Sequence, residues 1–540
     1  MPDSGAVSID VSPWRRVVPE PVRADGAAVL LWLPAMVAGG VLGWGASAPQ
    51  AWPLSLLALV GLTGVVLITE RRSARLGLVS VGLGVSAWAL AGVGWVALAV
   101  RDGSHATAWR VAVLAILLLV QVGPLLLIWG LLAGTTRGRS PVAIVSRWVL
   151  CLAGAETLRQ AGWWGSGYAS LAAAFVDAPG AAAWVPVVGA GGWSWAVAAV
   201  AGGVALWLWF FTTGARPAAR WTLAGTLLAT ALLSGWPARA WTVPRAGAEQ
   251  TLRVIQPPLQ RGERWTVQAR DQALARLHRT MAAAPPGAVI VTSETYFPEP
   301  PPSAPGGAWG DLLRRAARTQ VHLLLGMPHV LRDFDGLHLM NAVVQISPER
   351  QSLYAKERLV PGGEYLPWSD LLGPVYAEMF DNVRTGQRGA PAELTQPLFV
   401  AGQLVGASIC HELAFSLTMA ARARDVGWLA NLADDAWIDS ELYRRQMSTV
   451  ARLRAMEAGK PLVRASHGGH SILVGPDGRL LGRSDLAAGE PWPVSLQPHD
   501  GQTPYHHATW WWAGLPLACA ALWALLGLRS SLDAQPLATP

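Results

Sequence analysis

The stretch Val405-Gly-Ala-Ser-Ile-Cys-His-Glu-Leu-Ala-Phe415 joins an apolar run to a cluster of reactive and ionisable residues. The run has the length and composition of a buried β-strand, and it ends at Cys410, His411 and Glu412. At a strand end, a rigid sheet can present a side chain to a cleft. Of the three cysteines in the chain, only Cys410 lies outside the long apolar segments. Two interpretations of Cys410 are open at this point, a nucleophile or a small buried hydrophobic residue.

Two further sites in the same part of the chain carry chemistry. Upstream, Ala288-Val-Ile-Val-Thr-Ser-Glu294 is an apolar strand pattern that ends in a carboxylate. Between it and Cys410 lies Tyr354-Ala-Lys356, which is followed by Pro361-Gly-Gly-Glu364. Glu294, Lys356 and Cys410 resemble, in this order, the Glu-Lys-Cys triad of the nitrilase superfamily. Glu364 matches the second glutamate of that superfamily.

Lysine is rare in this chain, and its position is informative for that reason. Lys and Arg together number 42, but only Lys356 and Lys460 are lysines. A compact ammonium can enter a tight site and stabilise an oxyanion, whereas a guanidinium is larger and keeps its proton. Lys356 is therefore predicted to be functional, with chance placement as the alternative. Lys460, in Ala-Gly-Lys-Pro, is expected to be a solvated charge after a helix.

The composition indicates a polytopic membrane protein joined to a water-soluble part. The chain is 52% hydrophobic and only 14% charged, and it contains 29 tryptophans; soluble domains average about 25% charged residues. The formal net charge is +7, but no basic run with interleaved aromatic residues supports nucleic-acid binding. With Cys410 alone in the soluble part, an intradomain disulfide cannot form there.

Apolar stretches long enough to span a bilayer dominate the first half of the chain. They lie at about 27–46, 52–69, 76–100, 108–133, 141–161, 181–213 and 221–241, and an eighth follows at 510–528. Arginines gather after the second, fourth and sixth stretches, at Arg71, Arg72, Arg75, Arg137, Arg139, Arg216 and Arg220. The positive-inside rule therefore places both termini in the cytoplasm and the segment after the seventh span outside.

The segment from 246 to 506 has shorter apolar runs and more charges, and it reads as an α/β layered domain. Predicted strands are 252–256, 288–293, 321–325, 342–346, 398–409, 428–432, 461–465 and 472–474, and predicted helices are 265–283, 308–318 and 441–458. The expected organisation is a cytoplasmic segment (1–26), a membrane domain of about seven helices (27–245), an extracytoplasmic catalytic domain (246–506), a transmembrane helix (507–529) and a cytoplasmic tail (530–540).

A nitrilase-type domain placed behind about seven spans and followed by one more resembles the apolipoprotein N-acyltransferases. This resemblance covers nearly the whole chain, and the motifs Gln256-Pro, Asp435-Ala-Trp437 and Gly475-Pro-Asp-Gly478 add to it within the sandwich-type domain. It implies a polytopic α-helical membrane domain plus an α-β-β-α sandwich on the periplasmic side of the bacterial cytoplasmic (inner) membrane. It also implies a phospholipid acyl donor and, as acceptor, the amino group of a diacylated apolipoprotein. We expect a monomer without cofactors.

The resemblance also assigns roles to individual residues. Cys410 would be the nucleophile that forms a thioester, and Glu294 the base. Lys356 and the backbone N–H of His411 would hold the oxyanion, and Glu364 would orient Lys356 or share proton transfer.

Three further positions have a functional and a structural interpretation. Glu412 matches a family glutamate or is a buried ion-pair partner, and Trp265 matches a functionally important tryptophan or packs a helix. Arg159 can pair with Glu156 within a span, because the two are three residues apart. That pair is either structural or a contact for a lipid phosphate.

The sequence departs from the family near the expected cleft, at His411, at Asp434 and at His467. His467-Gly-Gly-His470 lacks acidic or thiol companions nearby, so no metal site is expected. Two other functions stay open. One is a membrane-tethered amidase whose thioester is resolved by water, and the other is a diverged paralogue with another acceptor.

Overall fold

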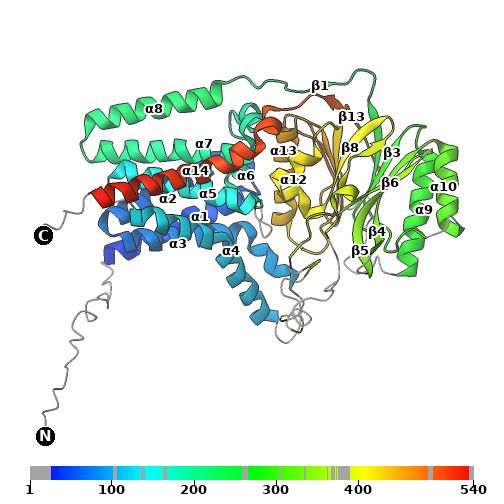
Figure 1. The fold of residues 1–540 in the computed structure, drawn as a ribbon, viewed down its shortest axis with the longest axis horizontal. Helices are drawn as coiled ribbons and strands as arrows, with labels where there is room; N and C mark the ends of the chain where they lie inside the picture. The colour runs from blue at the N-terminus through cyan, green and yellow to red at the C-terminus, as the bar shows by residue number, and fades with distance from the viewer. Residues whose placement is uncertain are drawn as a thin grey trace, which may run out of the picture.

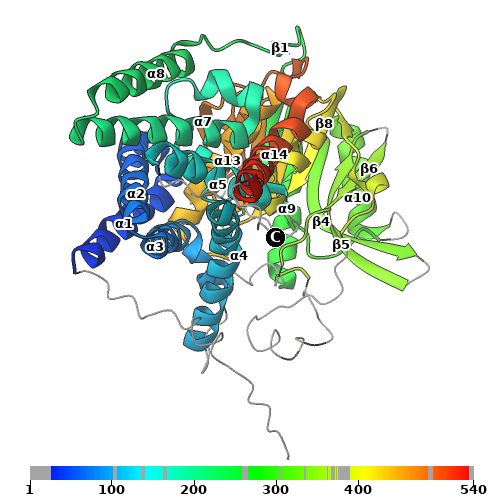
Figure 2. The ribbon, with the colours of Figure 1, turned by 60° about the vertical axis from the view of Figure 1, so that its left-hand side comes forward.

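The structure is a computed structural model, and it separates into a helical part and a sheet-rich part (Figures 1 and 2). It describes residues 26–100, 106–135, 140–161, 167–257, 266–302, 306–333, 336–348, 350–361, 363–365, 371, 374, 389–484 and 490–533. The long helices of the first part are α1 (Gly26–Gly45), α2 (Trp52–Arg72), α3 (Ala74–Val93), α4 (Ala106–Thr135), α5 (Pro141–Ala161), α7 (Ala181–Thr212) and α8 (Arg216–Gly235). The last helix of the chain, α14 (Pro504–Asp533), returns to pack among them.

Several helices of this bundle are built to cross a bilayer. Five have the length and hydropathy of membrane spans: Pro49–Arg72, Ala74–Ala99, Ala106–Leu132, Pro141–Arg159 and Ala181–Thr212. Large apolar side chains cover the outside of the bundle, and Leu119 is 72% exposed. The molecule is therefore a multi-pass membrane protein. The count of eight spans stays a prediction, because α1, α8 and α14 do not meet both conditions over the described residues.

Two six-stranded sheets form the second part. In one, the strand order is β13 (Trp492–Leu496), β2 (Gln250–Ile255), β3 (Val289–Thr292), β4 (His322–Asp333), β5 (Gly336–Ile346) and β6 (Gln351–Ala355). In the other it is β12 (Leu480–Arg483), β11 (Ile472–Val474), β10 (Leu462–His467), β9 (Trp428–Asp434), β8 (Gln403–Ile409) and β7 (Leu398–Val400). A short pair, β1 (Val243–Pro244) with β14 (His499–Asp500), ties the entry of this part to its exit.

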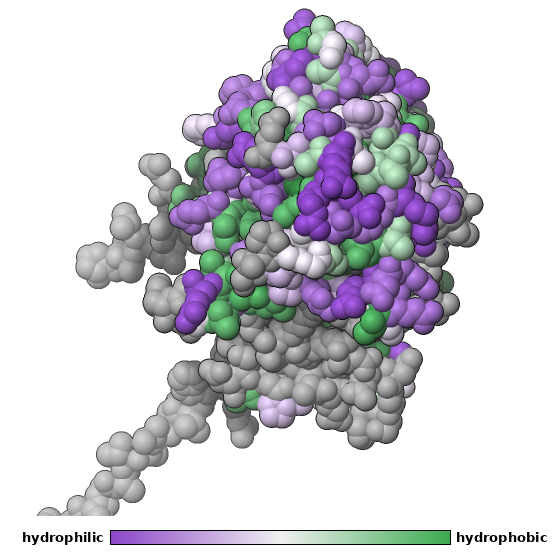
Figure 3. All heavy atoms as spheres, turned by 90° about the vertical axis from the view of Figure 1, so that its right-hand side faces the viewer, coloured by the Kyte–Doolittle hydropathy of each residue, from purple (hydrophilic) through white to green (hydrophobic). Residues whose placement is uncertain are grey.

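The layers are helix, sheet, sheet and helix, which confirms the predicted sandwich. Val291 and Tyr354 of one sheet meet Val405 and Leu432 of the other in a buried core between the sheets. On the outer side, α9 (Val267–Ala283) and α10 (Gly307–Thr319) cover the first sheet. On the inner side, α12 (Ser416–Arg422) and α13 (Glu441–Ala458) lie between the second sheet and the membrane helices. The face turned away from the membrane helices is largely hydrophilic (Figure 3).

Most predicted strands form, and the differences have local causes. The predicted strand 398–409 is a tight hairpin of β7 and β8, because Ala401 and Gly402 both adopt left-handed backbone angles (φ 47° and 78°) and turn the chain. The interpretation of Lys460 as a solvated charge is wrong. Its side chain is buried and donates to the carbonyl of His499, because the β1–β14 pair closes over the end of α13.

Candidate active site

Cys410 stands at the junction of strand β8 and a 3₁₀ helix, η6 (Cys410–Ala414). Its φ is +52°, in the left-handed region that residues other than glycine rarely adopt and that recurs at functional sites. The residue is 9% exposed, and its carbonyl accepts a hydrogen bond from Asn431 Nδ2 at 3.2 Å. The sharp turn from strand to helix holds the thiol at the edge of the sheet.

Glu412 fixes this turn from inside the protein. Its carboxylate is fully buried and accepts four hydrogen bonds. The donors are the N–H groups of Ile409, Glu357 and Arg358, at 2.7, 2.8 and 3.0 Å, and the Tyr354 hydroxyl at 2.8 Å. One carboxylate thus ties the segment of the cysteine to the segment that follows Lys356. These four donors satisfy the Glu412 carboxylate, and among the described residues it forms no ion pair.

Glu294 follows β3 and reaches across to the second sheet. Its Oε2 accepts the N–H of Asp434 at 2.9 Å, and its own N–H donates to the carbonyl of Ala433 at 3.4 Å. Its Oε1 accepts from Asn341 Nδ2 and lies 3.5 Å from Lys356 Nζ. The carboxylate is therefore held between strands of both sheets.

Lys356 follows β6 and is enclosed completely, with no exposed side-chain surface. Its Nζ donates to Glu364 Oε1 at 2.5 Å. Glu364 in turn accepts the N–H of Val360 at 2.8 Å through Oε2. Glu364 thus contacts Lys356 directly, and the lysine lies between two carboxylates.

The electrostatics of the site set its resting protonation. Burial raises the pKa of the Cys410 thiol well above its usual value; the Glu294 carboxylate raises it further, and Lys356 opposes both. Burial also raises the pKa of Glu294, against Lys356 and a hydrogen bond with Cys410. For Lys356, burial lowers the pKa, but Glu294 and Glu364 outweigh it and the pKa is raised. At neutral pH the thiol is protonated and the lysine is charged, so the thiol needs a base in contact with it.

His411 is a buried packing residue in this arrangement. Its ring meets Phe415 edge to face, with centroids 5.1 Å apart. Burial and the positive charges of Lys356 and Arg358 lower its pKa well below the usual value, so the imidazole is neutral at pH 7. Within the described part of the chain, its Nδ1 has no hydrogen-bond partner.

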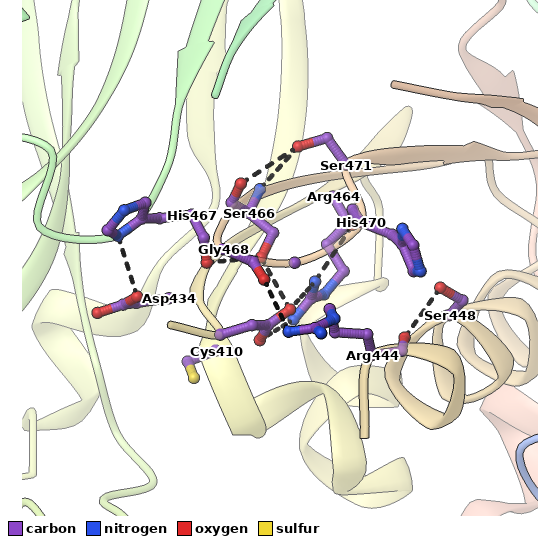
Figure 4. Close-up of polar contacts among 12 residues, drawn as sticks. Cys410, Asp434, Arg444, Ser448, Arg464, Ser466, His467, Gly468, His470 and Ser471 are labelled. Atoms are coloured by element: carbon purple, nitrogen blue, oxygen red, sulfur yellow. Dashed lines mark hydrogen bonds and ion pairs between the residues drawn. The ribbon is translucent and has the colours of Figure 1, made fainter. Parts of the chain in front are cut away.

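A second polar cluster lies behind Cys410, at the ends of β9 and β10 (Figure 4). Arg464 donates to both carboxylate oxygens of Asp435 at 2.8 Å, and Ser466 Oγ donates to the same carboxylate at 2.8 Å. Two of the positions that depart from the family also meet here, since His467 Nδ1 lies 3.2 Å from Asp434 Oδ1. The described residues contain no group of three or more His, Cys, Asp or Glu side chains that could hold a metal ion.

Arg159 lies away from this cluster, in the membrane bundle. Arg159 pairs with Glu156 on α5, as predicted, and also donates to Gln121 Oε1 at 3.0 Å inside the membrane bundle. Its guanidinium lies over the ring of Trp88, 5.9 Å from the centroid. Trp265 falls outside the described residues.

The membrane helices dock directly against the segment that carries the cysteine. A Cβ added to Gly167, in the loop after α5, would lie 2.1 Å from the carbonyl oxygen of Ala414 in η6. Glu457 of α13 accepts the N–H of Ala190, at the kink of α7, and the hydroxyl of Ser416, both at 2.8 Å. Only glycine fits at position 167, so the loop and η6 pack backbone to backbone.

Three residues of the site were not predicted from the sequence. Asn341 and Asn431 lie inside strands, and Tyr354 precedes Lys356 by two residues, yet each donates a hydrogen bond within the site. Polar residues inside an apolar strand pattern were the available signal, because a buried amide requires partners. Which partner each one finds depends on the pairing of strands far apart in sequence.

Known protein families match both the helical part and the sheet-rich part of the chain. Residues 38–203 match the family model of the apolipoprotein N-acyltransferase N-terminal domain, and residues 261–490 match that of carbon-nitrogen hydrolases. The apolipoprotein N-acyltransferase of Ralstonia nicotianae is 29% identical over 490 residues, covering 86% of this chain and 88% of that protein. The one from Nitrosomonas europaea is 27% identical over 457 residues, covering 82% and 87%. Among solved structures, the C. elegans NitFhit protein matches 47% of this chain and 62% of its own, at 15% identity and a TM-score of 0.36.

Proposed function

The chain belongs to the apolipoprotein N-acyltransferase family, and we propose that it moves an acyl chain from a membrane phospholipid to the N-terminal amino group of a diacylglyceryl-cysteine lipoprotein. One observation carries the proposal. Glu294, Lys356 and Cys410 converge from both sheets, and the cysteine segment packs on the membrane helices. All these groups come from one chain, and we propose an enzyme that acts as a monomer without a cofactor.

In the first step, Glu294 accepts the proton of the Cys410 thiol as the sulfur attacks the ester carbonyl of the phospholipid. Lys356 and the backbone N–H of His411 stabilise the oxyanion that forms. The C–O bond then breaks, and the lysophospholipid leaves with the proton that Glu294 held. The product is a thioester on Cys410.

In the second step, the lipoprotein amine attacks the thioester carbonyl and gives its proton to Glu294. The C–S bond breaks, and the thiolate recovers that proton. A covalent intermediate suits two bulky lipid substrates, because they use one site in turn rather than together.

The other candidates take supporting roles in this proposal. Glu364 orients Lys356, and Glu412 positions the cysteine turn. His411 packs beside the thioester, and Trp265 contacts substrate. Arg159 is structural, since its guanidinium is shared between Glu156 and Gln121.

We also propose that residues 246–506 form the catalytic domain on the periplasmic side of the inner membrane. The flanking parts keep the expected bounds: 1–26 and 530–540 in the cytoplasm, and 27–245 and 507–529 in the membrane. The arginine-rich gaps after alternate spans support this orientation.

The test is a transfer assay with the full-length protein in proteoliposomes of defined phospholipid. A synthetic diacylglyceryl-cysteine peptide should gain one acyl chain, measured by mass spectrometry, while lysophospholipid accumulates in equal amount. Release of free fatty acid without acylated peptide would support hydrolysis instead. Transfer to a different amine would support the diverged acceptor.

A further inference from the structure

Two buried tyrosines near the cysteine turn have hydroxyl groups that the fold does not use. Tyr168 lies in the segment that follows α5, and Tyr443 lies in the first turn of α13. The two residues are 9% and 4% exposed, and within the described part of the chain neither hydroxyl has a hydrogen-bond partner. This is unusual, because the hydroxyl of a buried tyrosine generally finds one.

The other buried tyrosines among the described residues show the usual arrangement. Tyr296, Tyr354 and Tyr505 each hydrogen-bond to another part of the chain through the hydroxyl, at 2.9, 2.8 and 2.7 Å. The hydroxyl oxygens of Tyr168 and Tyr443 also keep some solvent-accessible surface. They are therefore available to a ligand.

A tryptophan from the membrane part of the chain holds both tyrosine rings. Trp95, in the 3₁₀ helix η3 (Gly94–Ala99), meets the ring of Tyr168 edge to face, with centroids 5.3 Å apart. It also packs against the ring of Tyr443, with centroids 4.5 Å apart. Trp95 Nε1 donates to Gln446 Oε1 of α13 at 3.0 Å. The rings are thus fixed between the membrane helices and α13, whereas the two hydroxyls are not.

This aromatic cluster lies next to the reactive segment. Gly167, directly before Tyr168, packs on the backbone of η6, and α13, which carries Tyr443, also contacts η6. Burial raises the pKa of both tyrosines well above the usual value, and the charges of Cys410 and Asp435 raise it further. Both hydroxyls are therefore protonated at neutral pH, and each can donate a hydrogen bond.

A lipid has the chemistry that such a cluster can bind. Aromatic rings with a polar tip suit places where apolar and polar surroundings meet, as at the headgroup level of a membrane. The cluster joins the membrane helices to the sandwich, and a lipid changes at that level from acyl chains to an ester-linked glycerol. Ester oxygens accept hydrogen bonds but cannot donate them, so they match two hydroxyl donors.

We propose that Tyr168 and Tyr443 bind the ester-linked glycerol of a lipid substrate, with their hydroxyls as donors and with Trp95 positioning their rings. The inference rests on the proposed function, which brings two lipids to Cys410 in turn. The phospholipid donor and the diacylglyceryl group of the acceptor share this chemistry, so the two sources are tested separately.

The experiment varies the mole fraction of each lipid in mixed micelles that contain the full-length protein. In the first arm, a phospholipid of one defined acyl chain is varied, and the thioester on the Cys410 peptide is quantified by mass spectrometry. In the second arm, preformed acyl-enzyme receives varied amounts of a diacylglyceryl-cysteine peptide. The variants are Tyr168→Phe, Tyr443→Phe and the double variant. Tyr296→Phe is the matched control, because its buried hydroxyl donates to the carbonyl of Ala273.

Each single variant should raise the half-saturating mole fraction of the bound lipid about fivefold, and the double variant should raise it further, because hydrogen bonds to the lipid are lost. The limiting rate should stay within about twofold. The Tm should not fall, because no hydrogen bond within the protein is lost. Tyr296→Phe should do the reverse, with a lower Tm and an unchanged half-saturating mole fraction. A shift in the first arm assigns the subsite to the phospholipid, and a shift in the second assigns it to the acceptor.

Unchanged half-saturation in both arms would overturn the proposal, and so would a lower Tm without such a shift. Photolabelling provides a readout that does not depend on acyl transfer. Cys410→Ala protein is irradiated with a phospholipid that carries a diazirine next to its ester. The mole fraction for half-maximal labelling of the peptides with Trp95, Tyr168 or Tyr443 should rise about fivefold when Tyr168→Phe or Tyr443→Phe is added.

The two readouts separate failure of this inference from failure of the proposed function. If the wild type forms no thioester but the labelling shifts as stated, the proposed function fails and the lipid subsite survives. If the thioester forms and neither half-saturation nor labelling responds to the substitutions, only the subsite fails.

Discussion

The thiol of Cys410 is unreactive by itself in this environment. Burial and the adjacent Glu294 both favour its protonated form, so attack on an ester has to be coupled to proton transfer. Glu294 is the carboxylate that shares a hydrogen bond with this thiol, and burial raises its pKa as a base requires. The proton shared by Cys410 and Glu294 therefore resides on the Cys410 sulfur in the resting site.

Replacing Lys356 with arginine should be as damaging as replacing it with alanine. The lysine side chain has no exposed surface and lies between Glu294 and Glu364, which leaves no room for a guanidinium. Loss of an oxyanion donor typically costs about a hundredfold to a thousandfold in rate. Acyl-enzyme formation by Lys356→Arg, measured in a single-turnover assay, should fall by that much. Near-normal turnover would show that Lys356 supplies only charge.

His411→Tyr should retain acyl-enzyme formation and transfer within about threefold. The lowered pKa keeps His411 neutral around and above neutral pH. Tyrosine is neutral over the same range. The rate–pH profiles of the two proteins should therefore be parallel from about pH 6 to 8. An ionisation present only in the wild type within this range would give His411 a role of its own.

At the scale of elements, the strand patterns predicted where the reactive residues stand, but not how they are held. The apolar runs before Glu294 and Cys410 are strands, because buried strands read as continuous apolar segments. The four donors to Glu412 come from segments up to 58 residues away, and the contact of Asp434 with His467 depends on strand pairing. Such contacts follow from register, which local patterns do not contain.

Glu412→Gln should destabilise the site even though it preserves the shape of the side chain. A glutamine has one acceptor oxygen in place of two, so at least one of the buried N–H donors loses its partner. Each such loss costs about 1–3 kcal/mol. Thermal unfolding in detergent should show a lower Tm together with slower acyl-enzyme formation. Glu393→Gln, at an exposed position, is the control. An unchanged Tm for Glu412→Gln would contradict the role of Glu412.

At the scale of the whole molecule, the order of the parts could be predicted from composition, but their docking could not. The shift from apolar runs to short strands near residue 246 separates membrane helices from sandwich. The close approach of Gly167 to Ala414, and of Glu457 to Ala190, joins residues more than 240 positions apart. These contacts place the cysteine segment against the helices, where a lipid ester could reach it.

The proposed topology predicts the outcome of reporter fusions along the chain. Fusions after Arg75, Arg139 and Arg220 should report a cytoplasmic location, and one near Gln250 an external location, because arginine-rich loops stay inside. Fusions of the same reporters to Ser47 and to Ser104, in the intervening gaps, are the matched controls and should read external. An external signal at Arg139 would reverse the orientation and remove the lipoprotein as acceptor.

The central claim is that the acyl chain is carried as a thioester on Cys410. Mass spectrometry of the Cys410 peptide tests this claim most directly. Protein purified and incubated with a phospholipid of one defined acyl chain should carry that chain on the Cys410 peptide, in a form released by hydroxylamine. Cys410→Ala and Glu294→Gln should lack the adduct while remaining folded and inserted. Acyl transfer to the acceptor peptide by Cys410→Ala at a rate near that of the wild type would contradict the account.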